Sequence, residues 1–168
     1  MSSPAWEEIP LERYDDHWGP FDARYHFSPS LHGGPAIDEP SPSVTIDLAP
    51  VLQATSPAVF AAGEQALNAL AVLAMVRAFP EDQRLLVLDW QHPSHWFWPH
   101  RQVLQPEPRP WLAFPNGDYY AVLTEDLSTG TFGHPWEQTL CVFGAPLLKT
   151  LVPLLASWLP TKRAKPAG

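Results

Sequence analysis

Cysteine is nearly absent from this sequence: Cys141 is the only one in 168 residues. A single cysteine excludes an internal disulfide framework and a zinc cluster built from cysteines. Cys141 lies in an apolar run, residues 139–143. We expect it to be a small core residue, because a nucleophilic cysteine needs an electropositive, partly exposed setting.

Positive charge is also scarce, with ten Lys and Arg against 18 Asp and Glu and a net charge of −8. The basic residues are scattered singly, apart from Lys162, Arg163 and Lys165. Since a nucleic-acid backbone is bound through clustered Lys and Arg, we expect no nucleic-acid partner. An acidic body suits a basic protein partner, or simply keeps a protein soluble.

No uninterrupted apolar run is long enough to predict a membrane span. The longest apolar stretch, residues 58–79, is broken by four polar residues: Glu64, Gln65, Asn68 and Arg77. The first ten residues carry two acids and no apolar core, unlike a signal peptide. We therefore expect a cytoplasmic protein with no membrane partner.

Proline and tryptophan are abundant instead, with 21 and eight residues. So many prolines exclude a coiled coil or a helical bundle, and proline-free windows show where regular structure can form. The longest window is Pro57 to Phe79, with cap candidates at Thr55-Ser56 and Pro80 just past its end. Because most of its circumference is apolar, this window predicts one long helix buried against a sheet on more than one side.

Other windows predict strands, because they are rich in β-branched, aromatic and aliphatic residues. The stronger segments are 43–48, 85–91, 118–124 and 136–143, and the weaker ones are 23–27, 95–98 and 111–114. A polar turn around 128–130 makes 118–124 and 136–143 an antiparallel pair. A shorter C-terminal helix begins near Pro146 and should kink at Pro153. The prediction is an α+β fold with a mainly antiparallel sheet of about five or six strands.

Composition does not divide the chain into two parts. We expect a single α+β domain over residues 1–160. Residues 161–168 hold three cations and no acid, and we interpret them as a flexible basic tail.

Four of the seven histidines fall in two short segments, residues 88–101 and 130–138. Both segments join a His-Pro step to tryptophan and to carboxylate or amide groups at the end of a strand, where a rigid scaffold presents polar groups to a ligand. Together they predict a polar pocket. Its polar groups would be Asp89, His92, His100, Asp118, His134 and Glu137, and its walls Trp90, Trp98, Tyr120 and Trp136.

General acid–base chemistry is the reaction type that this pocket favours, because histidine titrates near neutrality. We expect His134 to be the acid or base and the Glu137 carboxylate to fix its tautomer, with His92 and Asp118 as further catalytic candidates. Arg101 would anchor a substrate carboxylate or phosphate. The alternatives are that His134 and Glu137 bond to loop backbone and pin the turn, and that the tryptophans are ordinary core residues.

Other chemistries find less support. A set of five residues would suffice for zinc or iron: His92, His95, His100, His134 and Glu137. Their spacing matches no metal signature, so we assign no metal ligands and leave any cofactor unknown. Ser94 lies in no nucleophile elbow, and neither Gly33-Gly34 nor residues 130–133 fit a phosphate-binding loop.

The same segments resemble the bacterial family called domain of unknown function 2716, which is common in actinomycetes. The resemblance is specific at residues 88–101, reading Leu-Asp-Trp-Gln-His-Pro and then Trp-Phe-Trp-Pro-His-Arg, and at residues 116–144. Weaker matches extend it over most of the chain. His92, His100 and His134 belong to the family pattern, whereas His95 stands where Tyr is frequent. The resemblance implies one domain of bacterial origin and no particular reaction.

Two hypotheses for the function follow. The first is a small enzyme or small-molecule-binding protein that uses the predicted pocket. The second is an interaction protein, immunity or antitoxin-like, whose acidic aromatic surface binds a basic partner. A cavity lined by both histidine segments would favour the first hypothesis, and a packed interior with an exposed acidic patch the second. The oligomeric state is not predicted.

Overall fold

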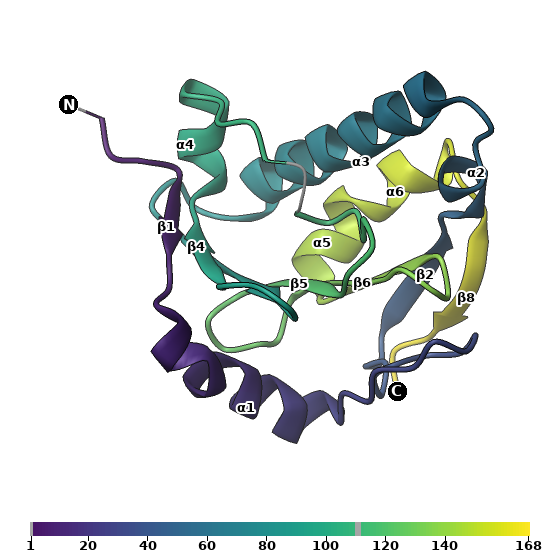
Figure 1. The fold of residues 1–168 in the computed structure, drawn as a ribbon, viewed down its shortest axis with the longest axis horizontal. Coiled ribbons are helices and arrows are strands. Elements are labelled where there is room, and N and C mark those ends of the chain that lie inside the picture. Colours follow the sequence, from purple (N-terminus) through teal and green to yellow (C-terminus); the bar gives the residue numbers. More distant parts are fainter. Residues whose placement is uncertain (1, 110–111) are drawn as a thin grey trace.

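The computed structural model describes residues 2–109 and 112–168, which form one antiparallel sheet between two layers of helices (Figure 1). The strands, in chain order, are β1 (Trp6–Glu8), β2 (Ser43–Asp47), β3 (Leu85–Asp89), β4 (His95–Phe97), β5 (Tyr120–Leu123), β6 (Gly130–His134), β7 (Thr139–Phe143) and β8 (Thr161–Lys165). Their order across the sheet is β1-β4-β3-β5-β6-β7-β2-β8. The α+β class and the antiparallel sheet are confirmed, but this sheet has eight strands instead of five or six.

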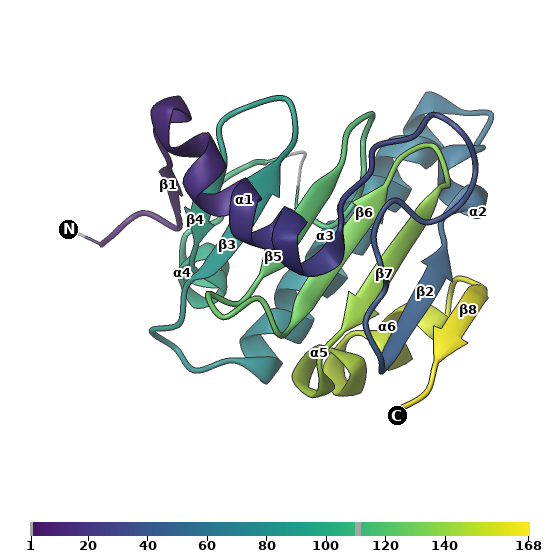
Figure 2. The same cartoon turned by 90° about the horizontal axis from the view of Figure 1, so that it is seen from below.

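Helices cover both faces of the sheet (Figure 2). One face carries α2 (Ala49–Leu52), α3 (Pro57–Ala78), α4 (Pro99–Leu104), α5 (Ala145–Thr150) and α6 (Val152–Ala156); the other carries α1 (Tyr14–Tyr25), preceded by the 3-10 turn η1 (Leu11–Arg13). Side chains alternate between the two cores: Val122 packs in the core that contains Leu67 of α3, and Ala121 in the core that contains Phe21 of α1. This alternation was expected for a strand at 118–124.

The long helix α3 forms over the predicted residues but is mostly exposed. Its buried residues are Gly63, Leu67, Ala71, Ala74 and Met75, a stripe that faces the sheet. The prediction of a helix buried on more than one side is wrong, because the neighbouring helices leave its outer side uncovered (Figure 1). Within the described residues, α3 alone is long and apolar enough to cross a membrane, judged by length and composition.

The weak strand predicted at residues 23–27 does not form, and residues 23–25 instead end helix α1. This helix runs through Pro20, which cannot donate a backbone hydrogen bond. Trp18, Phe21 and Tyr25 recur at helical spacing and are all buried against the sheet. Their burial outweighs the hydrogen bond lost at Pro20.

Residues 130–134, expected as part of a link, form strand β6 between β5 and β7, so these two strands are not neighbours. Two glycines, Gly130 and Gly133, make the sequence pattern of this strand hard to recognise. A Cβ atom on Gly130 would lie 2.1 Å from the Val122 carbonyl oxygen, and one on Gly133 would lie 2.9 Å from that of Ala113. These close backbone contacts leave no room for a Cβ atom, so glycine is needed at both positions although it weakens a strand.

The weak strand predicted at 111–114 begins at Trp111, which lies outside the described residues, and residues 112–114 form a bend. The predicted C-terminal helix divides at Leu151 into α5 and α6, with Pro153 in the first turn of α6. The prediction of a flexible tail is wrong for residues 161–165, because they form β8 and pair with β2. Their polar sequence shows no apolar alternation that would predict a strand.

Candidate functional site

Two buried carboxyl groups meet where β3 ends and β5 begins. Asp89 and Asp118 are each 3% exposed, and Asp89 lies opposite Tyr120 in the strand pairing. The loop after β3 closes over them: the Gln91 N–H donates to Asp89 Oδ1 at 3.1 Å and lies 3.2 Å from Asp118 Oδ2. We call Asp89 and Asp118 the carboxyl pair.

His92 joins the carboxyl pair to solvent. Its Nδ1 lies 3.0 Å from Asp89 Oδ1 and 3.7 Å from Asp118 Oδ2, while its side chain is 64% exposed. The three residues offer ligand atoms that all lie within 4.8 Å of one another. An exposed imidazole in contact with buried carboxyls can carry protons between them and water.

One acid of the carboxyl pair, Asp118, has a raised pKa. Burial raises the pKa of Asp118 to about 6, and a hydrogen bond with the Asp89 carboxyl adds to this rise. Backbone N–H groups of Tyr119 and Gln91 oppose it. A carboxyl group with this pKa can both donate and accept a proton at neutral pH, as general acid–base catalysis requires.

A cavity of about 240 Å³ opens beside Asp89. We call it the edge cavity; its lining is Glu8, Asp89, His92, Pro93, His95, Arg109 and Tyr120. The strands β1, β4, β3 and β5 lie side by side, so Glu8 faces His95 and Asp89 faces Tyr120 across the sheet. The volume corresponds to roughly eight water molecules, which is room for a small polar ligand.

Tyr120 adds a buried hydroxyl to this cavity. Burial and then the charges of Asp89 and Asp118 raise the pKa of its phenol. The hydroxyl therefore stays protonated and can donate a hydrogen bond.

His134 lies on the opposite face of the sheet. Its ring centroid is 4.9 Å from that of Tyr119, which also contacts Trp136 at 5.2 Å. The backbone N–H of Glu137 donates to His134 Nδ1 at 3.1 Å, and burial lowers the pKa of the ring. The backbone of Glu137, and not its carboxylate as predicted, therefore orients this histidine.

The Glu137 carboxylate is bound elsewhere. Arg163 Nη1 and Nη2 donate to it at 2.6 and 3.0 Å, and the same guanidinium donates to Glu39 at 2.9 Å from Nε and 2.5 Å from Nη2. Burial alone would raise the pKa of Glu137, but hydrogen bonds from Arg163 and Thr139 hold it below its ordinary value. We call Glu39, Glu137 and Arg163 the arginine clamp.

The remaining predicted residues divide between two other places. His100 Nε2 lies 2.9 Å from the Phe79 carbonyl oxygen. Arg101 packs over the Trp98 ring at 4.1 Å and donates to the Pro4 carbonyl, so its guanidinium already has partners. Trp90 packs against Tyr119 in the core on the α1 side.

The predicted pocket is thus split by the sheet. The structure brings together Asp89, His92, Asp118 and Tyr120. The opposite face of the sheet carries His134, Trp136 and Glu137. The start of α4 carries Trp98, His100 and Arg101. Alternation along the predicted strand 118–124 could have shown this, because Tyr119 and Tyr120 must face opposite sides of the sheet. Sequence reasoning missed Glu8, Glu39, Tyr119, Arg109 and Arg163.

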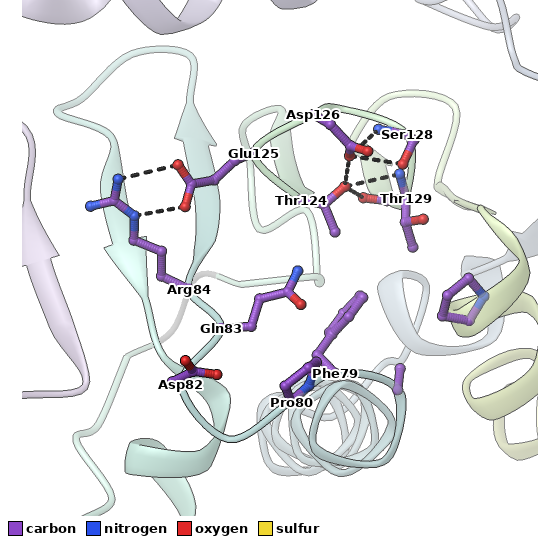
Figure 3. A pocket seen from close by; sticks show the side chains of 12 residues that line it. Phe79, Pro80, Asp82, Gln83, Arg84, Thr124, Glu125, Asp126, Ser128 and Thr129 are labelled. Atoms are coloured by element: carbon purple, nitrogen blue, oxygen red, sulfur yellow. Dashed lines mark hydrogen bonds and ion pairs between the residues drawn. The ribbon is translucent and has the colours of Figure 1, made fainter.

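A larger hollow, of about 650 Å³, lies between the loop after α3 and the loop after β5 (Figure 3). Two of its charged groups are paired with each other: Arg84 donates to Glu125 at 2.9 and 3.2 Å. Hydrogen bonds from Thr124 and Ser128 lower the pKa of Asp126 to about 2. These groups fix two loops, and the hollow contains none of the predicted site residues.

Comparisons with known proteins identify relatives of unestablished activity. A segment of 69 residues is 41% identical to Uncharacterized protein YxiI of Bacillus subtilis (strain 168), covering 40% of this chain and 43% of that protein. No solved structure matches. The model of the family described as Protein of unknown function (DUF2716) matches residues 8–148, which include both histidine segments. The chain therefore belongs to this family, as its sequence motifs predict.

Proposed function

We propose that the carboxyl pair, His92 and Tyr120 form an acid–base site that binds a small polar molecule in the edge cavity. One observation carries the proposal: two buried carboxyl groups lie together beside a cavity, and the basic group in contact with both is an exposed histidine. Burying like-charged groups together costs stability, and such arrangements cluster at functional sites.

Each residue has a distinct part in this proposal. Asp118 holds or releases the proton, and Asp89, which lines the cavity, faces the ligand. His92 exchanges protons with solvent, and the Tyr120 hydroxyl donates a hydrogen bond. The acidic lining suits a ligand that carries an amine or several hydroxyl groups.

A ligand screen by thermal shift tests this function. The probes are amino acids, small amines and sugars, each at about 1 mM, with wild type, Asp118→Asn and the exposed control Asp82→Asn. We expect at least one probe to raise the melting temperature of wild type and Asp82→Asn and to leave Asp118→Asn unchanged. A probe that stabilises all three proteins equally, or none that stabilises wild type, contradicts the proposal.

A divalent cation is a second candidate ligand, favoured by the 4.8 Å cluster of Asp89, His92 and Asp118. Two carboxylates and an imidazole suit Mn²⁺ or Zn²⁺. Calorimetric titration with each ion at pH 7.5 tests it. Binding that disappears in His92→Ala and in Asp118→Asn supports the cation; equal heats in wild type and both variants exclude it.

The interaction-protein hypothesis and the cytoplasmic location remain predictions. The net charge of −8 and the exposure of Trp136, at 37%, support an acidic aromatic surface for a basic partner. Recovery of no basic protein in a pull-down from the native host would count against it.

A further inference from the structure

The outer side of α3 is apolar and uncovered. Val59 is 58% and Leu73 39% exposed, and the helix carries two charged residues, Glu64 and Arg77, in 22 positions. A helix on the surface of a globular protein ordinarily has a polar outer side. Figure 1 shows α3 along the outside of the helical layer, where a partner can reach it.

Six residues on this side follow a coiled-coil repeat. They alternate in steps of three and four residues: Val59, Ala62, Ala66, Ala69, Leu73 and Val76. The first five are exposed and the last is half-buried. A repeat of this kind places one apolar stripe along a helix, and such a stripe packs against a second helix. We call these six residues the outer seam, distinct from the buried stripe that faces the sheet.

The outer seam is complementary to itself when two copies run antiparallel. A two-fold axis between Leu67 and Asn68 places Val59 opposite Val76 of the second copy. The same axis places Ala62 opposite Leu73 and Ala66 opposite Ala69. Leu73 of each copy then meets the small Ala62 of the other copy. Ala66 and Ala69 of both copies lie at the centre and let the two helices approach closely.

A parallel arrangement lacks this match, because every residue would meet its own copy. Leu73 would face Leu73 while Ala62 faced Ala62, leaving a wide and a narrow gap along one seam. Isologous two-fold contacts are the commonest assembly of soluble proteins. We propose that this chain forms a homodimer in which α3 packs antiparallel on α3 of a second copy.

The interface is small. The outer seam has six residues and extends for about 26 Å, whereas a standard interface has roughly 20–30 residues on each side. We therefore expect dissociation in the micromolar range, and exchange between monomer and dimer. This proposal is independent of the acid–base site, since none of the outer-seam residues lines the edge cavity.

Sedimentation velocity from about 5 to 500 µM tests the dimer. The variant is Ala66→Glu, at the centre of the outer seam, and the matched control is Ala61→Glu, also exposed on α3 but outside the seam. We expect wild type and Ala61→Glu to dimerise and Ala66→Glu to remain monomeric with an unchanged circular dichroism spectrum. A wild type that stays monomeric at 500 µM, or an Ala66→Glu that dimerises like wild type, overturns the proposal.

Cysteine cross-linking tests the direction of the helices, and the buried Cys141 does not interfere. The double variant Ala62→Cys, Leu73→Cys should form a disulfide-linked dimer under mild oxidation. The single variant Ala62→Cys should not, because its two copies would lie about 16 Å apart along the seam. Efficient cross-linking of the single variant would show a parallel pair and overturn the antiparallel register.

The rival occupant of the outer seam is a lipid bilayer, since α3 is apolar enough to span one. Flotation with phosphatidylcholine and phosphatidylglycerol vesicles distinguishes the two. We expect wild type to remain unbound. Vesicle binding that Ala66→Glu abolishes, together with a monomeric wild type, would assign the seam to the membrane and overturn the dimer.

Discussion

Two clusters in this molecule each contain two buried carboxyl groups, and they differ in the basic group that contacts these carboxyls. In the arginine clamp, Glu39 and Glu137 share the guanidinium of Arg163, which donates four hydrogen bonds of 2.5 to 3.0 Å. In the carboxyl pair, Asp89 and Asp118 share His92, at 3.0 and 3.7 Å. The first cluster has an arginine, whose guanidinium is always charged, and the second has an exposed histidine instead.

The difference appears in the acids themselves. The pKa of Glu137 is held below its ordinary value, and that of Asp118 is raised to about 6. Burial acts upward on both, and only the clamp supplies enough hydrogen bonds to reverse it. This difference supports our interpretation of the clamp as structural and of the carboxyl pair as the proposed functional site.

Replacing Arg163 with Met should have the largest effect on the comparison. It leaves two buried glutamates, each 4% exposed in the side chain, without their cation. Breaking a buried ion pair in this way costs about 3 to 5 kcal/mol. Urea unfolding at pH 7 measures the loss. The control is Lys162→Met on the same strand, an exposed residue, which should change the free energy of unfolding by less than about 0.5 kcal/mol.

Low pH should also lower the free energy of unfolding through the clamp. The folded pKa of Glu137 lies below its unfolded value, so its contribution to stability is present above about pH 4.5. It is lost as the pH falls through the folded pKa. Arg163→Met should lack this part of the acid dependence, and an unchanged acid limb would show that the clamp does not supply it.

Asp118→Asn should raise the stability of the protein, in contrast to Arg163→Met. The folded pKa, about 6, lies above the unfolded value of 3.8, so wild type loses stability as the pH rises through this window. The variant carries no such charge and should be about 1 to 3 kcal/mol more stable than wild type at pH 8. At pH 4 the difference should vanish. Urea unfolding at both values measures it, and a variant that is less stable at pH 8 would show the carboxylate to be well compensated.

Arg101→Ala should have the smallest effect. The guanidinium packs on Trp98 and reaches a backbone carbonyl at an exposed position. Such a cation–π contact is worth about 0.5 to 1 kcal/mol. Thermal unfolding should show a loss of that size, and ligand binding in the edge cavity should be unchanged. Loss of binding would return Arg101 to its predicted role as a substrate anchor.

Sequence patterns predicted most of the central sheet and the long helix, because these elements show apolar periodicity and proline punctuation. They failed where tertiary contacts override local preference. Pro20 lies inside α1 because three aromatic residues bury one face of that helix, and the glycines of β6 are needed by close backbone neighbours. The polar strand β8 owes its place to Arg163 and to pairing with β2, which no local pattern shows.

The candidate site was predicted in part, for a similar reason. Asp89, His92, Asp118 and Tyr120 lie close because β3 and β5 are neighbours with apolar sequences that predict strands. His134 appears adjacent in the sequence pattern and is not in the cavity, because β6 presents it on the other face. Which strands are neighbours, and on which face a loop residue falls, depends on contacts distant in the chain.

Arg163 follows Glu39 by 124 positions, and this separation sets when the clamp can close. During synthesis, Glu39 and β2 emerge long before Arg163, whereas Glu137 precedes it by only 26 residues. Until β8 arrives, β2 is an open sheet edge that holds unpaired backbone groups beside two uncompensated acids. Pairing of β8 with β2 is therefore a late step in folding, because contacts of such long range form slowly. A nascent chain that lacks β8 would expose this sheet edge to chaperones and proteases.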